Sequence, residues 1–313
     1  MYAAFGGTLE VSQTVLADNR QCGVFVSGAE SSLNASEVVI SGTRESKTNV
    51  PASGLFVREG RATLHAASLL GNEGISITAH GRAVLQLSGL DVHATVLQQG
   101  TRLAPALGLF GGARATLVDS MLRDHRREAV HVEGVGSHVE LRQVLLTGTR
   151  GGLTPDYGIA VAAHAGGRAS LDRCEVRDNL GSALLALGDG TELHVRRSRI
   201  ADNRGIGLHV ANGAAAHAAD SVLVRNAGTG AGAFGQKARL TLEAVLVRDT
   251  RPFATGDGGA GLVGSVGAEV HAKGLGLLRN ALAGAIFEEV ATLSHFWIAE
   301  TSDGAMDRGG GGL

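Results

Sequence analysis

Two histidines and a glutamate recur at matching places in neighbouring copies of a repeated unit, and these residues could do chemistry. His194 and His217 each lie nine residues before an asparagine that serves as the reference position of its unit, and Glu192 precedes His194 by two. Imidazole is the commonest transition-metal ligand and can act as a general acid or base. Two histidines without a third aligned ligand make a poor metal site. The sequence therefore predicts no metal site here and leaves a catalytic candidate, with an exposed polar face as the alternative.

Two carboxylates form the second catalytic candidate. Asp178 and Asp202 directly precede the reference position in successive units. Glycosidases use carboxylate pairs, and a separation of ~5 Å would suit a retaining enzyme. However, Arg177 or Arg204 could neutralise the pair. From Asp202 onward the same position alternates in charge, which favours a ladder of ion pairs worth ~0.5 kcal/mol each: Asp202, Arg225, Asp249, Arg279 and Glu300.

The unit that positions these residues recurs from end to end at spacings of 21 to 30 residues. An apolar residue lies three places before the reference position in all twelve copies, and small or apolar pairs precede it by ten and eight residues. The reference residues are Asn19, Thr43, Asn72, Thr95, His125, Thr149, Asn179, Asn203, Asn226, Thr250, Asn280 and Thr301.

Three short runs of apolar and polar alternation in each unit have the period of a strand with one buried face. Leucine-rich repeats would need a helical segment and a fixed leucine frame, and neither is present. The pattern predicts an all-β solenoid, a parallel β-helix of about twelve rungs, with each unit forming one rung of three strands. At ~4.8 Å per rung this is a rod of about 55 Å.

The asparagines at the reference position are predicted to hydrogen-bond along the rod as a ladder: Asn19, Asn72, Asn179, Asn203, Asn226 and Asn280. Asparagine also tolerates the left-handed backbone of a tight bend, so we expect that conformation at this position. Four units with threonine there carry about seven extra residues, which predicts four loops at one corner. All four prolines fall in these loops, where no sheet hydrogen bond is needed: Pro51, Pro105, Pro155 and Pro252.

The loops and one aromatic column are the predicted binding surface, since recognition often lies in loops on a rigid scaffold. The alternative is that such insertions drift without function. The loop candidates are Arg44, Lys47, Arg102, Arg150, Asp156, Tyr157, Arg251 and Asp257. The aromatic candidates are expected in one outward column, with Ser76 between them: Phe25, Phe56 and Phe110.

Composition excludes several classes of protein. The chain has 313 residues, of which 47 are glycine, and 44% are hydrophobic, which is too many for a disordered chain. A net charge of −2 gives no reason to expect nucleic acid or an anionic membrane as partner. No apolar run reaches the ~20 residues of a membrane span, and the first residues do not form a signal peptide. Cys22 and Cys174, six rungs apart, are too distant for a disulfide.

With its tight turns, the chain resembles the right-handed parallel β-helix repeat family, the scaffold of pectate-lyase-like proteins. The resemblance lies in turns of the form Asp-Asn with a following glycine, seen as ADN at 17–19, RDN at 177–179 and ADN at 201–203, with VRN at 224–226 and LRN at 278–280. It covers nearly all the chain. This scaffold carries lyases, hydrolases, adhesins and spacers, so the resemblance implies the fold far more than the function.

These patterns lead to three functional hypotheses. The first is a non-catalytic extracellular or cell-surface module that binds a glycan or a protein; the location follows from the resemblance alone. The second is a polysaccharide lyase or glycoside hydrolase, the only hypothesis that involves a cofactor, namely calcium. The third is a structural spacer. We expect an N-terminal remnant at 1–6, a β-helix domain at 7–306 and a glycine-rich tail at 307–313, with missing sequence or another chain covering the rod ends.

Overall fold

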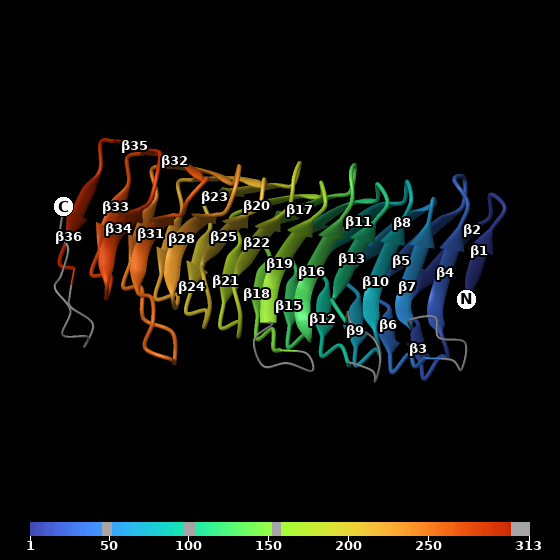
Figure 1. The fold of residues 1–313 in the computed structure, drawn as a ribbon. Coiled ribbons are helices and arrows are strands. Elements are labelled where there is room, and N and C mark those ends of the chain that lie inside the picture. Colours follow the sequence, from blue (N-terminus) through green and yellow to red (C-terminus); the bar gives the residue numbers. More distant parts are fainter. Residues whose placement is uncertain (46–51, 97–103, 152–157, 302–313) are drawn as a thin grey trace.

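A computed structural model describes residues 1–45, 52–96, 104–151 and 158–301. The chain coils into a rod with three flat faces, and each face is a parallel sheet of twelve strands. We call them sheets A, B and C, in the order in which the chain visits them (Figure 1). The predicted parallel β-helix of about twelve rungs is confirmed. No helix in the described part of the chain is long and apolar enough to cross a membrane.

Sheet A begins inside the stretch expected to precede the β-helix. Tyr2 pairs with Phe25, so residues 2–4 already form a strand and the expected remnant at 1–6 is wrong. The expected tail at 307–313 lies outside the described residues. Sheet A consists of β1 (Tyr2–Ala4), β4 (Cys22–Ser27), β7 (Ser53–Arg58), β10 (Ile75–His80), β13 (Leu107–Phe110), β16 (Arg127–Glu133), β19 (Gly158–His164), β22 (Leu184–Leu187), β25 (Leu208–Ala211), β28 (Thr229–Phe234), β31 (Ala260–Gly264) and β34 (Ala283–Phe287).

Sheet B shows the cleanest alternation: all its strands but β2 and β35 have five residues and bury the second and fourth side chains. In β8, Ala62 and Leu64 are buried and the other three residues are exposed. Its strands are β2 (Thr8–Ser12), β5 (Ser32–Ser36), β8 (Arg61–His65), β11 (Val84–Ser88), β14 (Arg114–Val118), β17 (His138–Arg142), β20 (Arg168–Asp172), β23 (Glu192–Arg196), β26 (Ala215–Ala219), β29 (Arg239–Glu243), β32 (Glu269–Lys273) and β35 (Ala291–Ser294).

Sheet C supplies the apolar residue three places before each reference position. Leu69, Val92 and Ile200 are fully buried there. Its strands are β3 (Val15–Ala17), β6 (Val39–Ser41), β9 (Ser68–Leu70), β12 (Asp91–His93), β15 (Met121–Arg123), β18 (Leu145–Thr147), β21 (Glu175–Arg177), β24 (Arg199–Ala201), β27 (Val222–Val224), β30 (Leu246–Arg248), β33 (Gly276–Leu278) and β36 (Trp297–Ala299).

The asparagine ladder runs inside the rod. Asn179 Nδ2 donates to Asn203 Oδ1, and Asn203 Nδ2 donates to Asn226 Oδ1, both at 2.8 Å. Elsewhere Asn72 and Asn280 accept from the backbone N–H of the threonine in the preceding rung. Asn19 is half-buried, and its Nδ2 has no partner within the described ranges.

The expected left-handed asparagine is wrong. The left-handed residue is the one before the reference position, for example Asp178, Asp202 and Arg225, with φ of 57°, 58° and 53°. Asparagine stands at the next position because its amide reaches the buried backbone of the neighbouring rung. The bend itself exposes the preceding side chain, so that residue can be polar or charged.

After two long loops the strand register differs from the expected one by two residues. Leu107 and Val161 align with Val130, whereas the glycine and apolar pairs Gly108-Leu109 and Gly158-Ile159, taken as the strand starts, predict Leu109 and Ile159 there. The expected column of Phe25, Phe56 and Phe110 is therefore wrong in part. Phe25 pairs with Phe56, the next rung presents Thr78, and Phe110 pairs with His80 one outward position further on. Ser76 is fully buried. The length of a loop does not determine which residue begins the following strand, so the register could not be predicted from it.

Both cysteines are free thiols. Cys174 is buried in the core cluster and Cys22 is half-buried at the start of β4. Burial raises the pKa of each thiol to about 11. The prediction that they form no disulfide is confirmed.

Candidate functional site

A groove of about 690 Å³ crosses the outer face of sheet A near the middle of the rod, over β16 and β19 and their neighbours. Six of the residues that line it can carry charge or bind a proton. They are Arg127, Glu128, Glu133, His131, His164 and His209. None of these residues was predicted as a site from the sequence.

A break in strand alternation brings Glu128 to this face. Arg127 has a left-handed backbone with φ of 68°, and both Ala129 and Val130 are fully buried. Because two consecutive residues point inward, Glu128 and His131 both lie on the outer face although they are three residues apart. The local backbone therefore places a carboxylate beside an imidazole within one strand.

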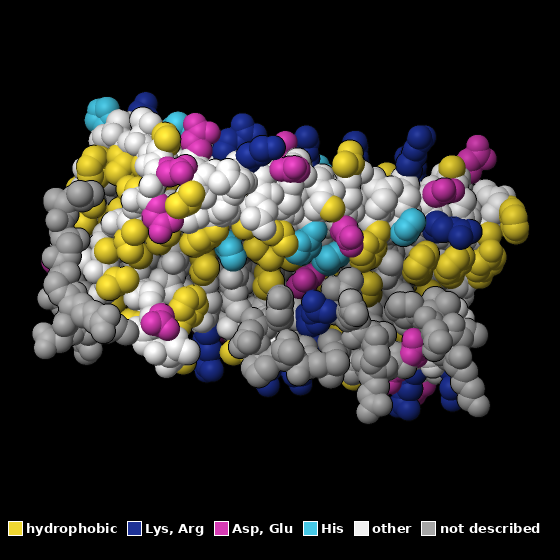
Figure 2. Space-filling model, viewed as in Figure 1, with side chains coloured by type: hydrophobic (Ala, Val, Ile, Leu, Met, Phe, Trp, Pro, Cys, Tyr) yellow, Lys and Arg dark blue, Asp and Glu magenta, His cyan; other side chains and the backbone are white. Residues whose placement is uncertain are grey.

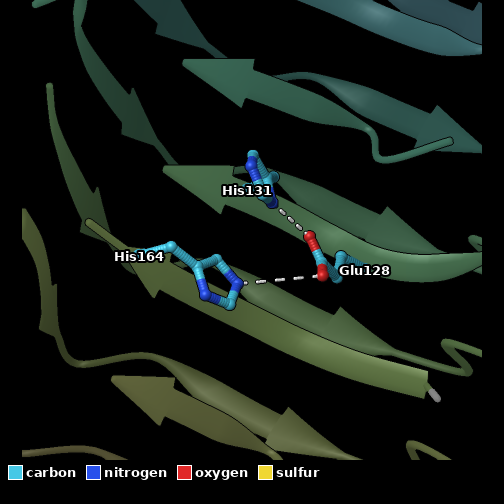
Figure 3. Close-up of side chains that lie close together, drawn as sticks. All are labelled: Glu128, His131 and His164. Carbon is cyan, nitrogen blue, oxygen red and sulfur yellow. Dashed lines mark hydrogen bonds and ion pairs between the residues drawn. The ribbon is translucent and has the colours of Figure 1, made fainter. Parts of the chain in front are cut away.

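The three central side chains point toward one another (Figure 3). His131 Nδ1 lies 2.5 Å from Glu128 Oε2, and His164 Nε2 lies 4.0 Å from Glu128 Oε1. The other ring nitrogen of His131 lies 3.1 Å from Glu133 Oε2. The side chains of Glu128 and His131 are 5% and 6% exposed, so this is a buried polar cluster open to the groove through His164.

The groove perturbs its imidazoles in different directions. Burial alone would lower the pKa of His131, but the hydrogen bond and charge of Glu128, together with Glu133, raise it above the usual value. Burial lowers the pKa of His164, although Glu128 opposes the shift. Burial also lowers the pKa of His209. A carboxylate with two close imidazoles can transfer protons to a bound molecule or ligate a metal ion.

Aromatic rings lead along sheet A to and beyond this cluster. Neighbouring rings lie 5.0–5.3 Å apart in three groups, separated by the rungs that contain Thr78 and Leu185. On this face, hydrophobic side chains gather at the N-terminal end and histidines follow toward the middle (Figure 2). We call the set the aromatic stripe: Tyr2, Phe25, Phe56, Phe110, His131, His164, His209 and Phe234.

Glycines make room for two of these rings. A Cβ on Gly108 would lie 2.8 Å from the Phe110 ring, and one on Gly232 would lie 2.5 Å from the Phe234 ring. In these two strands the sequence pattern glycine, apolar residue, phenylalanine marks a ring folded back over its own strand. This pattern was the available signal for the stripe. The cluster had a fainter one, since Glu128, His131 and Glu133 lie within six residues of an otherwise apolar strand.

The predicted histidine pair lies on a different face, sheet B. His194 and His217 are register partners, and their ring centroids are 6.3 Å apart. Each has a carboxylate oxygen at 3.6 Å, from Glu192 and Glu243 respectively. Their side chains are 49% and 36% exposed, so the structure brings the predicted residues together at the surface of sheet B, where His194 lines another groove of about 690 Å³.

The predicted carboxylate pair is engaged by arginines. Arg177 Nη1 lies 2.5 Å from Asp178 Oδ2. Arg225 donates to both carboxylate oxygens of Asp202, at 2.7 and 2.6 Å, and lowers the pKa of that carboxyl group. Arg279 binds Asp249 in the same way further along the rod. These ion pairs correspond to the charge ladder that was the alternative to a catalytic carboxylate pair.

The loop candidates are only partly described. Arg150 and Arg251 reach across the corner to Asp124 and Asp202, at 3.8 and 3.5 Å. The backbone carbonyl of Asp257 accepts a hydrogen bond from the backbone N–H of Phe253. The backbone of Arg44 forms an isolated parallel β-bridge with that of Arg20. Four other candidates, Lys47, Arg102, Asp156 and Tyr157, lie outside the described residues.

Several solved structures share this architecture. A chain of the Vag8–C1 inhibitor complex matches with a TM-score of 0.59 at 16% identity, over 92% of this chain and 80% of that one. The periplasmic alginate epimerase AlgG matches with 0.44 at 8% identity, over 94% and 75%. The GH87 alpha-1,3-glucanase from Streptomyces thermodiastaticus strain HF3-3 matches with 0.43 at 11% identity, over 96% and 64%. Such low identities show the fold alone.

No curated protein matches the chain. A family is nevertheless evident from the repeat. The family described as right handed beta helix region matches residues 73–246, which are 174 of the 313 residues. The chain therefore belongs to the right-handed β-helix family.

Proposed function

We propose that the protein is an extracellular or cell-surface module that binds a linear glycan along sheet A. The observation that carries the proposal is the aromatic stripe, which runs parallel to the rod and meets the polar groove at Glu128 and His131. Ligand sites combine apolar contact area with a few convergent polar groups. The stripe supplies the first and the groove the second.

A repeating polymer suits this surface better than a compact ligand. Successive rungs present outward side chains at ~4.8 Å intervals on a rigid, preorganised face. Each contact can be weak, because many are made at once and little order has to be imposed on binding. The groove adds hydrogen-bonding side chains such as Ser182 and Asn212, which could bind sugar hydroxyl groups.

Calorimetric titration with a panel of acidic and neutral oligosaccharides tests this proposal. We expect Phe56→Ala and Phe110→Ala each to weaken binding about tenfold, as expected when an aromatic contact is truncated. Phe253→Ala is the matched control, since this partly exposed phenylalanine lies at the loop-bearing corner. Loss of binding in the Phe253 variant alone would move the site to that corner. Absence of binding across the panel would contradict the proposal.

A second candidate function is turnover of the bound glycan by a lyase or hydrolase reaction. It is favoured by one observation, the buried Glu128 carboxylate between two imidazoles at the groove. The same oligosaccharides would be incubated with the protein, with and without calcium, and unsaturated products and new reducing ends measured. Activity that disappears in Glu128→Gln would establish catalysis in the groove. Activity lost instead in His217→Ala or Asp202→Asn would locate it elsewhere, and none at all would leave binding alone.

A further inference from the structure

Three potential donor groups converge on one point of the groove. One nitrogen from each of His131 and His164 and one oxygen of Glu128 all lie within 4.8 Å of one another. They come from two adjacent strands, β16 and β19, which pair in parallel register. We propose that these three side chains form a binding site for a divalent transition-metal ion of the zinc type.

The donor chemistry selects the class of metal. Two imidazoles with one carboxylate suit zinc, cobalt, nickel or iron, whereas calcium and magnesium prefer sets made only of oxygen. No metal site was predicted from the sequence, because the repeat pattern aligned only His194 with His217, and this exposed pair has no third aligned ligand. The cluster on sheet A has the third ligand.

The spacing is within small side-chain adjustments of a tetrahedral site. Ligands about 2.0–2.1 Å from zinc in a tetrahedron lie about 3.3 Å from one another. Glu128 Oε2 is 2.5 Å from His131 Nδ1, and Glu128 Oε1 is 4.0 Å from His164 Nε2. One distance must lengthen and the other shorten, which a rotation of the Glu128 carboxylate toward His164 accomplishes while the backbone stays in place.

A further carboxylate holds His131 in the orientation that a metal needs. Glu133 Oε2 lies 3.1 Å from His131 Nε2, on the opposite side of the ring from Glu128. With its Nε2–H donated to Glu133, the neutral imidazole presents the Nδ1 lone pair to the metal. This carboxylate–histidine–metal arrangement orients the ring and increases its basicity as a ligand.

Contacts with two neighbouring rings restrain the His131 imidazole further. The His131 ring lies between the rings of Phe110 and His164, at centroid distances of 5.3 and 5.2 Å. A ligand that is already held in place loses little entropy when the metal binds. His131 is therefore prepared as the central ligand, and His164, whose side chain is 22% exposed, is the more accessible of the two imidazoles.

Three protein ligands leave a coordination position open. The cluster borders the groove of about 690 Å³, so water or a ligand oxygen atom can reach that position. Structural zinc sites are closed by four protein ligands, whereas sites that act on a bound molecule keep one position free. The bound ion would therefore polarise an oxygen of the molecule in the groove, rather than serve as a structural staple.

Titration of the full chain with zinc chloride, followed by calorimetry, tests the site directly. Cobalt(II) gives a second readout, since its visible absorption reports tetrahedral coordination. We expect one ion per chain. His164→Ala and Glu128→Gln should each weaken binding at least 100-fold, and Glu133→Gln should weaken it 10- to 100-fold, as expected for an outer carboxylate. The His194→Ala/His217→Ala double variant is the matched control and should bind as the parent does.

The outcomes separate the metal site from a purely structural Glu128–His131 ion pair. Zinc should raise the melting temperature of the parent and of the sheet B control but not that of His164→Ala. If Glu128→Gln does not fold, His164→Ala and Glu133→Gln still decide, because both variants keep the Glu128–His131 ion pair. Absence of zinc binding, or binding lost only in the sheet B variant, would overturn the proposal. No glycan enters the titration, so its result is independent of the proposed function.

Discussion

At the scale of single residues, the ladder position holds one residue that is neither asparagine nor threonine. His125 is fully buried, with Nε2 3.0 Å from the Val92 carbonyl oxygen and Nδ1 3.2 Å from Thr95 Oγ1. Burial lowers its pKa to about 3, and the neighbouring imidazole of His93 acts in the same direction while Asp91 opposes it. The rod thus contains a neutral histidine that acid must charge.

This histidine should make the protein sensitive to mild acid. Its folded pKa of about 3 lies below the unfolded value of 6.5, so its contribution is complete above pH 6.5 and is lost as the pH falls toward 3. The loss amounts to about 1.4 kcal/mol per pH unit in that window. Urea unfolding at pH 7 and pH 4.5 measures how much the free energy of unfolding falls between the two pH values. This fall should be smaller in His125→Asn than in the parent by roughly 3 kcal/mol. Equal decreases in parent and variant would contradict this account.

Residue identities in the core were predictable and residue conformations were not. The apolar residues three places before each reference position were identified from spacing alone, because burial imposes a period. The left-handed residue was misplaced by one, since the sequence shows which residues recur and not which bond bends. The Glu128 cluster was missed for a related reason. Its members lie outside the period-two pattern that identified the strands.

At the scale of the strand, the columns of small residues beside the ladder set how closely two rungs approach. A Cβ on Gly207 would lie 2.4 Å from the Gly230 carbonyl oxygen and 2.9 Å from Asn226 Nδ2. Both neighbours are fixed, one as backbone and the other as part of the ladder. The size of the residue at the start of the strand is therefore limited by the next rung.

Gly207→Ala should consequently destabilise the rod by roughly 2–3 kcal/mol, as overpacking in a well-packed core does. Gly71→Ala is the matched control: its φ is +58° and no atom lies within 4 Å of the added Cβ. It should lose only about 1 kcal/mol from backbone strain, and Ala94 already occupies the equivalent place one rung later with φ of 53°. Urea midpoints measure both. Gly207 does not have the left-handed backbone of Gly71, so a loss no larger than that of the control would show that the contact with the next rung costs little.

Strand registers after the loops could not be predicted for a physical reason. An inserted loop can return to the sheet at any even offset and still present apolar residues inward, because alternation has a period of two. Leu107 and Leu109 are equally apolar, and only packing against the neighbouring rung selects between them. That two-residue choice displaced Phe110 from its expected column and obscured its contact with His131.

At the scale of the whole molecule, each rung is held in place by strand pairing with the adjacent rungs along the rod axis. Strands in the interior of each sheet pair on both sides, whereas β1, β2, β3, β34, β35 and β36 pair on one side only. Burial follows the same gradient. Leu171 in β20 is 2% exposed, whereas Ile298 in β36 is 39% exposed. Stability in such arrays is the sum of terms between adjacent rungs.

Hydrogen–deuterium exchange should therefore be graded along the rod. Amides in β17, β20 and β23 should exchange slowest, and those in β2 and β35 should exchange faster by orders of magnitude, because the ends open by losing a single interface. Mass spectrometry of peptides from each rung measures the gradient. Uniform protection from end to end would show that the rod unfolds as one cooperative unit.

The position of the left-handed bend has an evolutionary consequence. The residue before the ladder is aspartate, glycine, alanine, arginine or glutamate in different rungs, although the backbone there hardly varies. Side chains at that corner can therefore be exchanged without refitting the interior, and the ladder beneath can be inherited unchanged. The two adjacent positions are therefore under different constraints. The buried ladder position maintains the architecture, and the preceding position at the bend is free to acquire new charge patterns and, with them, new partners.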